Sequence, residues 1–213
     1  MQHDFSDLLE QRKLNTEGID SLLWVKEDDG AWEGPLNDWI SSHKEKILRH
    51  CKSFDTVIQA GGNQGMYPLF LSKIFKKVIT AEPDFLNFHC LVNNCTSENI
   101  IKLNCAFTDE NKMLSIVRPT MKNRGMFQTI DGDSILGIKI DDLKIDNISL
   151  IWLDIESYEI FALKGAKETI LKHRPVIITE NGNFEIESFI KSLHPSYQKV
   201  DQSVSDSIYV YQE

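Results

Sequence analysis

A glycine-rich run followed by a glutamate is the part of this chain whose spacing most clearly points to chemistry. The run Gly61-Gly62-Asn63-Gln64-Gly65 ends a short apolar, β-branched segment, and Glu82 stands about 20 residues beyond its first glycine. Glycines permit a tight turn and a close approach of the backbone to a ligand. A carboxylate at this distance can accept hydrogen bonds from both hydroxyls of a ribose. We therefore predict a site for a nucleoside cofactor.

The spacing of the glycines distinguishes between nucleoside cofactors. A dinucleotide fingerprint arranges three glycines as Gly-x-Gly-x-x-Gly around a pyrophosphate. Here Met66 occupies the position of the last glycine. A mononucleoside without phosphates fits this loop better, which favours S-adenosylmethionine. A nicotinamide-dependent oxidoreductase is the second enzyme hypothesis.

Three acidic residues end later apolar runs. Asp154 and Glu156 lie at the end of the run Ser149–Ile155, and Glu180 closes Pro175–Thr179. In extended chain Asp154 and Glu156 point to the same side. We predict that all three are catalytic, because their oxygens could favour a sulfonium charge or accept the proton of a hydroxyl. The alternative is that Asp154 and Glu156 cap the helix that follows. The same oxygens could hold a divalent cation, but we expect no metal.

Alternating strands and helices must position these residues. Nearly continuous apolar runs predict buried parallel strands at Phe54–Ala60, Val78–Ala81, Ile100–Cys105, Ser149–Ile155 and Pro175–Thr179. Helical periodicity predicts helices between and after them at Met66–Lys77, Asp84–Asn94, Tyr158–Leu171 and Phe184–Leu193. Two final strands, Tyr197–Val200 and Ile208–Tyr211, leave no room for a crossover helix and must be antiparallel. The sequence therefore predicts a doubly wound, mostly parallel α/β sheet with a C-terminal antiparallel strand pair, and such sheets bind ligands at the carboxyl ends of their strands.

The rest of the chain is less regular. Residues 1–50 are expected to form an N-terminal helical extension to a domain over 51–213, from the helical spacing of Phe5, Leu8 and Leu9 and then of Leu36, Trp39, Ile40 and Ile47. Short strands are expected at Met113–Val117 and Ile135–Ile140. The acceptor pocket is expected to come from residues 1–50 and 106–137. The tryptophans in the extension are expected to be core residues: Trp24, Trp32 and Trp39.

Composition narrows the class of protein. The chain has 213 residues, of which 41% are hydrophobic and 26% charged, with a net charge of −9. This is typical of a water-soluble globular protein, and the acidic balance argues against nucleic acid as a partner. No apolar run approaches the roughly 20 residues of a membrane span, and the N-terminus lacks the apolar stretch of a secretory signal. We expect a cytoplasmic protein whose cysteines match no zinc pattern and are reduced and buried: Cys51, Cys90, Cys95 and Cys105.

A series of motifs resembles FkbM-type class I methyltransferases. In chain order the motifs are Val57–Gly65, Ala81–Pro83, Ile140–Leu143, Leu153–Glu156 with Ala162–Ala166, and Arg174–Glu180. The resemblance implies a Rossmann-like, seven-stranded sheet, S-adenosylmethionine as methyl donor with S-adenosylhomocysteine as product, and a hydroxyl acceptor on a small molecule or glycan.

The same resemblance implies which residues bind the cofactor. Gly61, Asn63 and Gly65 would line its methionine part, Glu82 would hold the ribose, and Ala106 with Phe107 would border the adenine. The motifs also place Gln59, Gly62, Pro83 and Asp154 among the cofactor-binding residues.

The chain departs from the family pattern at three positions. Gln59 stands where an acidic residue is usual, Trp152 where lysine is common, and Ser157 where glycine is common. Two alternatives stand beside the main hypothesis. One is a nucleoside or RNA 2′-O-methyltransferase. The other is a degenerate domain that binds the cofactor without catalysis.

Overall fold

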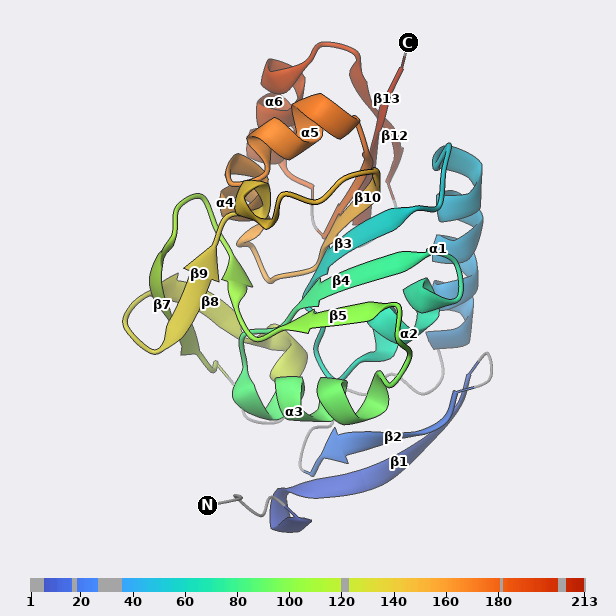
Figure 1. Ribbon diagram of the computed structural model, residues 1–213, viewed down its shortest axis with the longest axis vertical. Helices are drawn as coiled ribbons and strands as arrows, with labels where there is room; N and C mark the ends of the chain where they lie inside the picture. The colour runs from blue at the N-terminus through green and yellow to red at the C-terminus, as the bar shows by residue number, and fades with distance from the viewer. Residues whose placement is uncertain are drawn as a thin grey trace.

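A central sheet of seven strands organises the protein. The computed structural model describes residues 6–16, 19–26, 36–119, 123–180, 182–202 and 206–212. The strand order is β12-β13-β11-β10-β3-β4-β5 (Figure 1). The parallel strands are β3 (Thr56–Ala60), β4 (Lys77–Ala81), β5 (Ile100–Leu103), β10 (Ile148–Leu153) and β11 (Val176–Glu180). The antiparallel strands are β13 (Asp206–Tyr211), beside β11, and β12 (Tyr197–Gln202) at the edge. The prediction of a mainly parallel α/β sheet is confirmed.

Helices cover both faces of this sheet. One face packs against α1 (Leu36–His50), α2 (Met66–Ser72) and α3 (Phe85–Asn94), and the other against α4 (Glu159–Lys164), α5 (Lys167–His173) and α6 (Phe184–Leu193). Every residue of β3 and of β10 is buried, as expected for strands packed on two sides. All four cysteines are buried as well, as predicted. Within the described parts of the chain, no helix is both long and apolar enough to cross a membrane.

A second, smaller sheet occupies the region that the sequence left irregular. Its order is β6-β9-β7-β8, and its strands are β6 (Ala106–Phe107), β7 (Lys112–Val117), β8 (Gln128–Asp131) and β9 (Ile135–Ile138). A 3-10 turn, η2 (Arg124–Met126), precedes β8, and another, η3 (Ile140–Leu143), follows β9. The predicted strand Ile135–Ile140 therefore ends two residues early. In Figure 1 this sheet lies beyond the carboxyl ends of the central strands.

The N-terminal extension is only partly helical, so this prediction is wrong for its first half. After a short 3-10 turn, η1 (Ser6–Leu8), the chain forms an antiparallel hairpin of β1 (Leu9–Thr16) and β2 (Ile19–Val25). Hydrogen bonds to distant side chains hold β2, and local spacing cannot reveal such partners. The expected helix near Leu36 is present as α1. The expected positions Phe5 and Trp32 lie outside the described residues.

Two predicted helices are shorter than the periodicity indicates. Met66–Lys77 ends at Ser72, and Tyr158–Leu171 is divided into α4 and α5. The division falls at Gly165, where an added Cβ would lie 1.9 Å from the carbonyl oxygen of Thr108. This close backbone approach requires glycine and gives the break a packing cause.

Candidate cofactor and acceptor site

A pocket of about 460 Å³ opens at the carboxyl ends of β3, β4 and β10. Its size is within the usual range for small-molecule sites, roughly 300–1,000 Å³. The glycine loop and Glu82 form one part of its wall, and Asp154, Glu156 and Glu180 form another. The small sheet and the N-terminal hairpin contribute further lining residues. The position is where doubly wound sheets bind ligands.

The glycine loop is shaped by contacts that exclude side chains. Gly61 has a φ of +84°, and a Cβ there would lie 1.9 Å from the carbonyl oxygen of Asp154. At Gly62 a Cβ would meet a methyl carbon of Leu91 at 2.4 Å. Both glycines line the pocket, so the backbone itself forms the surface there. Gly65, at the start of α2, does not line it; its missing Cβ instead makes room for α3.

Glu82 ties the glycine loop to the end of β4. Its Oε2 accepts the backbone N–H of Asn63 at 2.8 Å, and its Oε1 accepts that of Asp84 at 2.8 Å. Burial raises the pKa of Glu82 to about 7, and the nearby Asp84 charge adds to the rise. Because Glu82 lines the pocket, it is positioned to accept hydrogen bonds from a ligand. Pro83 also lines the pocket, as predicted from its motif.

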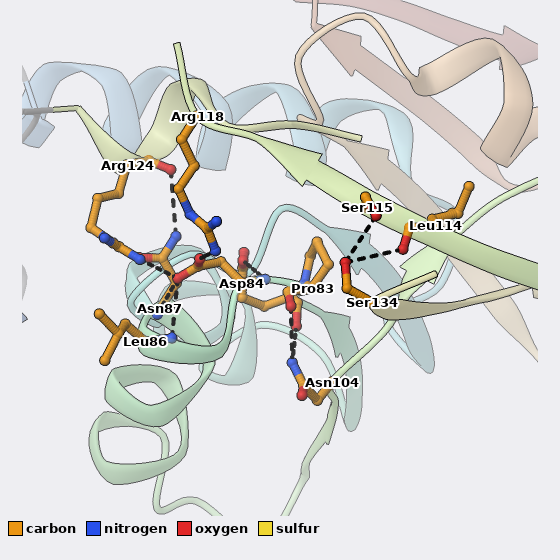
Figure 2. A network of polar contacts seen from close by, with 11 residues as sticks. Pro83, Asp84, Leu86, Asn87, Asn104, Leu114, Ser115, Arg118, Arg124 and Ser134 are labelled. Atoms are coloured by element: carbon orange, nitrogen blue, oxygen red, sulfur yellow. Dashed lines mark hydrogen bonds and ion pairs between the residues drawn. The ribbon is translucent and has the colours of Figure 1, made fainter. Parts of the chain in front are cut away.

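Asp84 connects this loop to the small sheet (Figure 2). Its Oδ1 accepts two N–H groups of α3 and pairs with the Arg124 guanidinium, and its Oδ2 lies 3.0 Å from Nη2 of Arg118. Arg124 Nε also donates to Asn87 Oδ1 at 3.1 Å. Burial acts to raise the pKa of Asp84, but the Asn87 N–H and the two arginines outweigh it and hold that pKa below its usual value. The wall carrying Arg124 is thereby attached to the Glu82 loop. Local sequence pattern does not reveal this link, because its partners lie far apart in the chain.

Carboxylates gather in another part of the pocket wall, the acidic end. Asp154 and Glu180 are hydrogen-bonded to each other, and Asp206, paired with Glu180 across β11 and β13, lies beside them. Burial raises the pKa of Asp154 well above its usual value, and the charges of Glu180 and Asp206 raise it further. Burial likewise raises the pKa of Glu180. We infer that Asp154 carries a proton and donates it in a hydrogen bond to Glu180. Oε2 of Glu180 is buried and has no hydrogen-bond partner among the described residues.

Glu156 reaches the pocket in a way that an extended chain does not provide. Its φ is +53° and that of Ser157 is +73°, so the alternation expected from Asp154 to Glu156 is broken. Burial raises the pKa of Glu156 to about 7, and the Glu180 and Glu159 charges contribute. The N-cap residue of α4 is Tyr158, which makes no side-chain capping hydrogen bond, so the capping alternative for Asp154 and Glu156 gains no support there. The carboxylate of the buried Glu159 accepts the Ile155 N–H at 3.1 Å and supports this turn.

Besides Gly65, three further residues predicted to bind the cofactor do not line the pocket. Gln59 is fully buried, where it accepts a hydrogen bond from the Thr80 hydroxyl and donates one to the Ala60 carbonyl. Ala106 and Phe107 form β6 and are packed in the core. The pocket is lined instead by Ile116 and Thr129 of the small sheet and by Phe127, which directly precedes β8. A two-residue strand is too short for its residue pattern to show that Ala106 and Phe107 are packed in the core.

Trp152, at the position where lysine is common, is a core residue. Its ring stacks on His43 from α1 at a centroid distance of 5.0 Å and on Tyr67 from α2 at 5.5 Å. Tyr67 lines the pocket and its hydroxyl is hydrogen-bonded to Asp154. The tryptophan therefore supports the acidic end of the pocket from behind.

Comparisons with known proteins agree with this architecture. The methyltransferase FkbM domain matches residues 59–209. This chain belongs to the FkbM methyltransferase domain family, which confirms the resemblance found in its motifs. A search of curated proteins finds no match.

Solved structures share the fold at low sequence identity. The FkbM methyltransferase of Methylobacillus flagellatus KT is 22% identical with a TM-score of 0.56, over 75% of this chain and 44% of its own. The T. thermophilus 16S rRNA N2 methyltransferase, in complex with S-adenosylmethionine and guanosine, is 10% identical with a TM-score of 0.56, over 97% and 51%. A Streptococcus mutans protein in complex with S-adenosylhomocysteine is 10% identical with a TM-score of 0.51, over 81% and 97%. This chain thus spans about half the length of the first two.

Proposed function

We propose that this chain transfers a methyl group from S-adenosylmethionine to a hydroxyl oxygen of a small-molecule, sugar or glycan-like acceptor. One observation carries the proposal: a single pocket joins a bare glycine backbone and the Glu82 carboxylate to the carboxylates of Asp154 and Glu180. The first pair suits a nucleoside, and the second suits a positive charge and a departing proton. Family membership supports the same reaction class.

The pocket residues fit S-adenosylmethionine. Gly61 and Gly62 must be glycines, because a Cβ at either would collide with protein atoms, and both line the pocket with backbone alone, which lets a ligand approach closely. The side-chain Oδ1 of Asn63 is buried and has no hydrogen-bond partner among the described residues, which leaves an acceptor for a ligand donor. Glu82 supplies a carboxylate for the ribose hydroxyls. S-adenosylmethionine has no phosphate groups and so needs no cationic side chain in the glycine loop, and this loop contains no lysine or arginine.

The protein's own residues account for the remaining chemistry. When bound, the cofactor supplies a methyl group on a sulfonium, ready for in-line displacement. Glu180 receives the proton of the acceptor hydroxyl on its unpartnered Oε2. Asp154 orients Glu180 through their hydrogen bond. The cluster with Glu156 and Asp206 favours a positive charge in its vicinity.

The charge of the pocket favours a neutral hydroxylated acceptor over a polyanion. The basic pocket residue Arg124 is paired with Asp84 and hydrogen-bonded to Asn87. The net charge of −9 also disfavours a polyanion, because phosphate backbones bind to clustered lysines and arginines. A nucleoside or RNA acceptor is accordingly the alternative outcome of an acceptor screen.

Calorimetry tests the cofactor assignment. S-adenosylmethionine and S-adenosylhomocysteine should bind the purified protein, and NAD should not. Glu82→Gln should weaken S-adenosylmethionine by about 1.5–3 kcal/mol, because a charge-assisted acceptor is lost. Asp146→Asn removes a carboxylate that is 73% exposed and is the matched control, with unchanged affinity. Equal affinities in both variants, with both cooperatively folded, would contradict the ribose assignment.

Methyl transfer tests the reaction. Cofactor carrying a carbon-13 methyl group is incubated with sugars, small hydroxylated metabolites, nucleosides and RNA, and the carbon chemical shift of the product distinguishes oxygen from nitrogen as acceptor. We expect an O-methyl product from a sugar or small metabolite. An RNA product would favour the nucleic-acid alternative. Tight cofactor binding without any transfer would favour the degenerate domain.

A further inference from the structure

Trp24 brings the N-terminal hairpin into the pocket wall. It is the next-to-last residue of β2 and lines the same pocket as the glycine loop. Its side chain is only 3% exposed and packs in the core with residues of α2 and α3. The sequence predicts a core role for this residue, and the structure adds a surface that faces a ligand site.

Side chains of the main domain hold β2 in place. Asn94, the last residue of α3, accepts the Leu23 N–H at 2.7 Å and donates to the Leu23 carbonyl at 2.9 Å. The same amide donates to the carbonyl of Gln64 at 2.6 Å. Gln64 in turn accepts the Val25 N–H at 2.8 Å through its side chain. The backbone on both sides of Trp24 is therefore attached to the glycine loop and its neighbouring helix.

The indole N–H of Trp24 has no acceptor among the described residues. The Nε1 atom is buried, and none of the residues that the structure describes accepts its hydrogen bond. Arg12 lies over the ring at 5.2 Å from its centroid, so the ring is packed from both sides. A buried polar group without a partner costs free energy. An acceptor on a ligand would remove this cost.

We propose that Trp24 is a binding residue of the pocket, whose indole N–H donates to the carboxylate of the amino-acid half of the cofactor. This inference rests on the proposed function. Charge decides which ligand atom is the partner: Glu180 and Asp206 repel a carboxylate, and Glu82 is an acceptor suited to hydroxyls. Trp24, whose strand is attached to Gln64, offers the ligand carboxylate an N–H donor instead. Hydrogen bonds to charged acceptors are the stronger ones.

A truncated ligand tests the proposal. Isothermal calorimetry compares S-adenosylhomocysteine with 5′-methylthioadenosine, which keeps the adenosine and sulfur but lacks the amino-acid carboxylate. Trp24→Phe keeps an aromatic ring and removes the N–H. It should weaken S-adenosylhomocysteine about tenfold and leave 5′-methylthioadenosine unchanged. Leu22→Ala, on the same face of β2 and equally buried at 3% exposure, is the matched control for lost packing and should affect both ligands equally.

Each other outcome overturns the inference. If Trp24→Phe loses affinity equally for both ligands, the N–H contacts the adenosine or acts through packing of the hairpin. If it loses affinity for neither ligand, the N–H does not contact the cofactor. If wild-type protein binds neither ligand, the proposed function fails with it. If Trp24→Phe does not fold, nitrogen-15 spectra of the wild-type protein decide: the assigned Trp24 indole N–H resonance should shift with S-adenosylhomocysteine and not with 5′-methylthioadenosine. A resonance that both ligands move alike contradicts the proposal.

Discussion

Nε2 of His43, on the first helix, lies 3.1 Å from Oδ2 of Asp206, on the last strand, and both side chains are at least 96% buried. The pair joins parts of the chain that are separated by 163 positions. His43 also stacks on Trp152, so it braces the acidic end of the pocket through two contacts. The N-terminal extension is therefore part of the support of the site.

Loss of this brace should reduce stability. His43→Phe keeps an aromatic ring against Trp152 and removes one polar partner of the buried Asp206. The free energy of unfolding should fall by about 1–3 kcal/mol, measured by urea denaturation. His50→Phe changes the more exposed histidine on the same helix and should cost less than half as much. Equal costs in the two variants would show that the His43–Asp206 contact contributes little.

Replacing either of the two arginines that pair with Asp84 should lower the free energy of unfolding, by very different amounts. Arg124 is 3% exposed and Arg118 is 44% exposed, and both pair with Asp84. Arg124→Met removes the buried cation that pairs with the buried Asp84 carboxylate, so it should lower the free energy of unfolding by about 3–5 kcal/mol. Arg118→Met breaks a solvent-exposed contact and should cost less than about 1 kcal/mol. Thermal melting of the two variants checks this, and similar losses would contradict the assigned burial of the Arg124 pair.

Stability without cofactor should fall as the pH rises from about 4.5 to about 7. Burial raises the pKa values of Glu82, Glu156 and Glu159 from 4.5 to about 7 in the folded chain. In that window the folded protein holds protons that the unfolded chain has released, so the free energy of unfolding decreases with pH. Glu82 alone accounts for about 3 kcal/mol. Urea denaturation at the two ends of the window should show a shallower slope for Glu82→Gln, and an unaltered slope would contradict the raised pKa of Glu82.

Replacing Glu180 should lower turnover much more than replacing Asp154. Glu180→Gln removes the proton acceptor and should lower saturating turnover roughly 10²–10⁴-fold. Asp154→Asn retains an N–H donor toward Glu180, as protonated Asp154 does, so it should melt like the wild type and lose roughly tenfold or less. Labelled methyl transfer and melting temperature are measured for both. An Asp154→Asn variant as inactive as Glu180→Gln would instead make Asp154 the proton acceptor.

Local pattern was sufficient to predict the buried parallel strands and the glycine loop. The apolar runs at β3, β4, β10 and β11 carry their own signal, because a buried parallel strand needs apolar residues on both faces. The glycine loop and Glu82 are readable for a similar reason: both follow directly from strands, and the carboxyl ends of adjacent parallel strands meet at one edge. The pocket therefore contains Gly61, Glu82 and Asp154 as the sequence predicts.

The tertiary structure alone decided which distant residues complete the site. Asp206 reaches the acidic cluster only because β13 pairs with β11 in the register that sets it opposite Glu180. Arg124 reaches Asp84 through the small sheet, and Trp24 enters the pocket because Asn94 and Gln64 hold its strand. Gln59 turned inward to Thr80, although its motif position suggested the cofactor. Periodicity reports which face of an element is apolar, whereas these contacts depend on how elements far apart in the chain pack together.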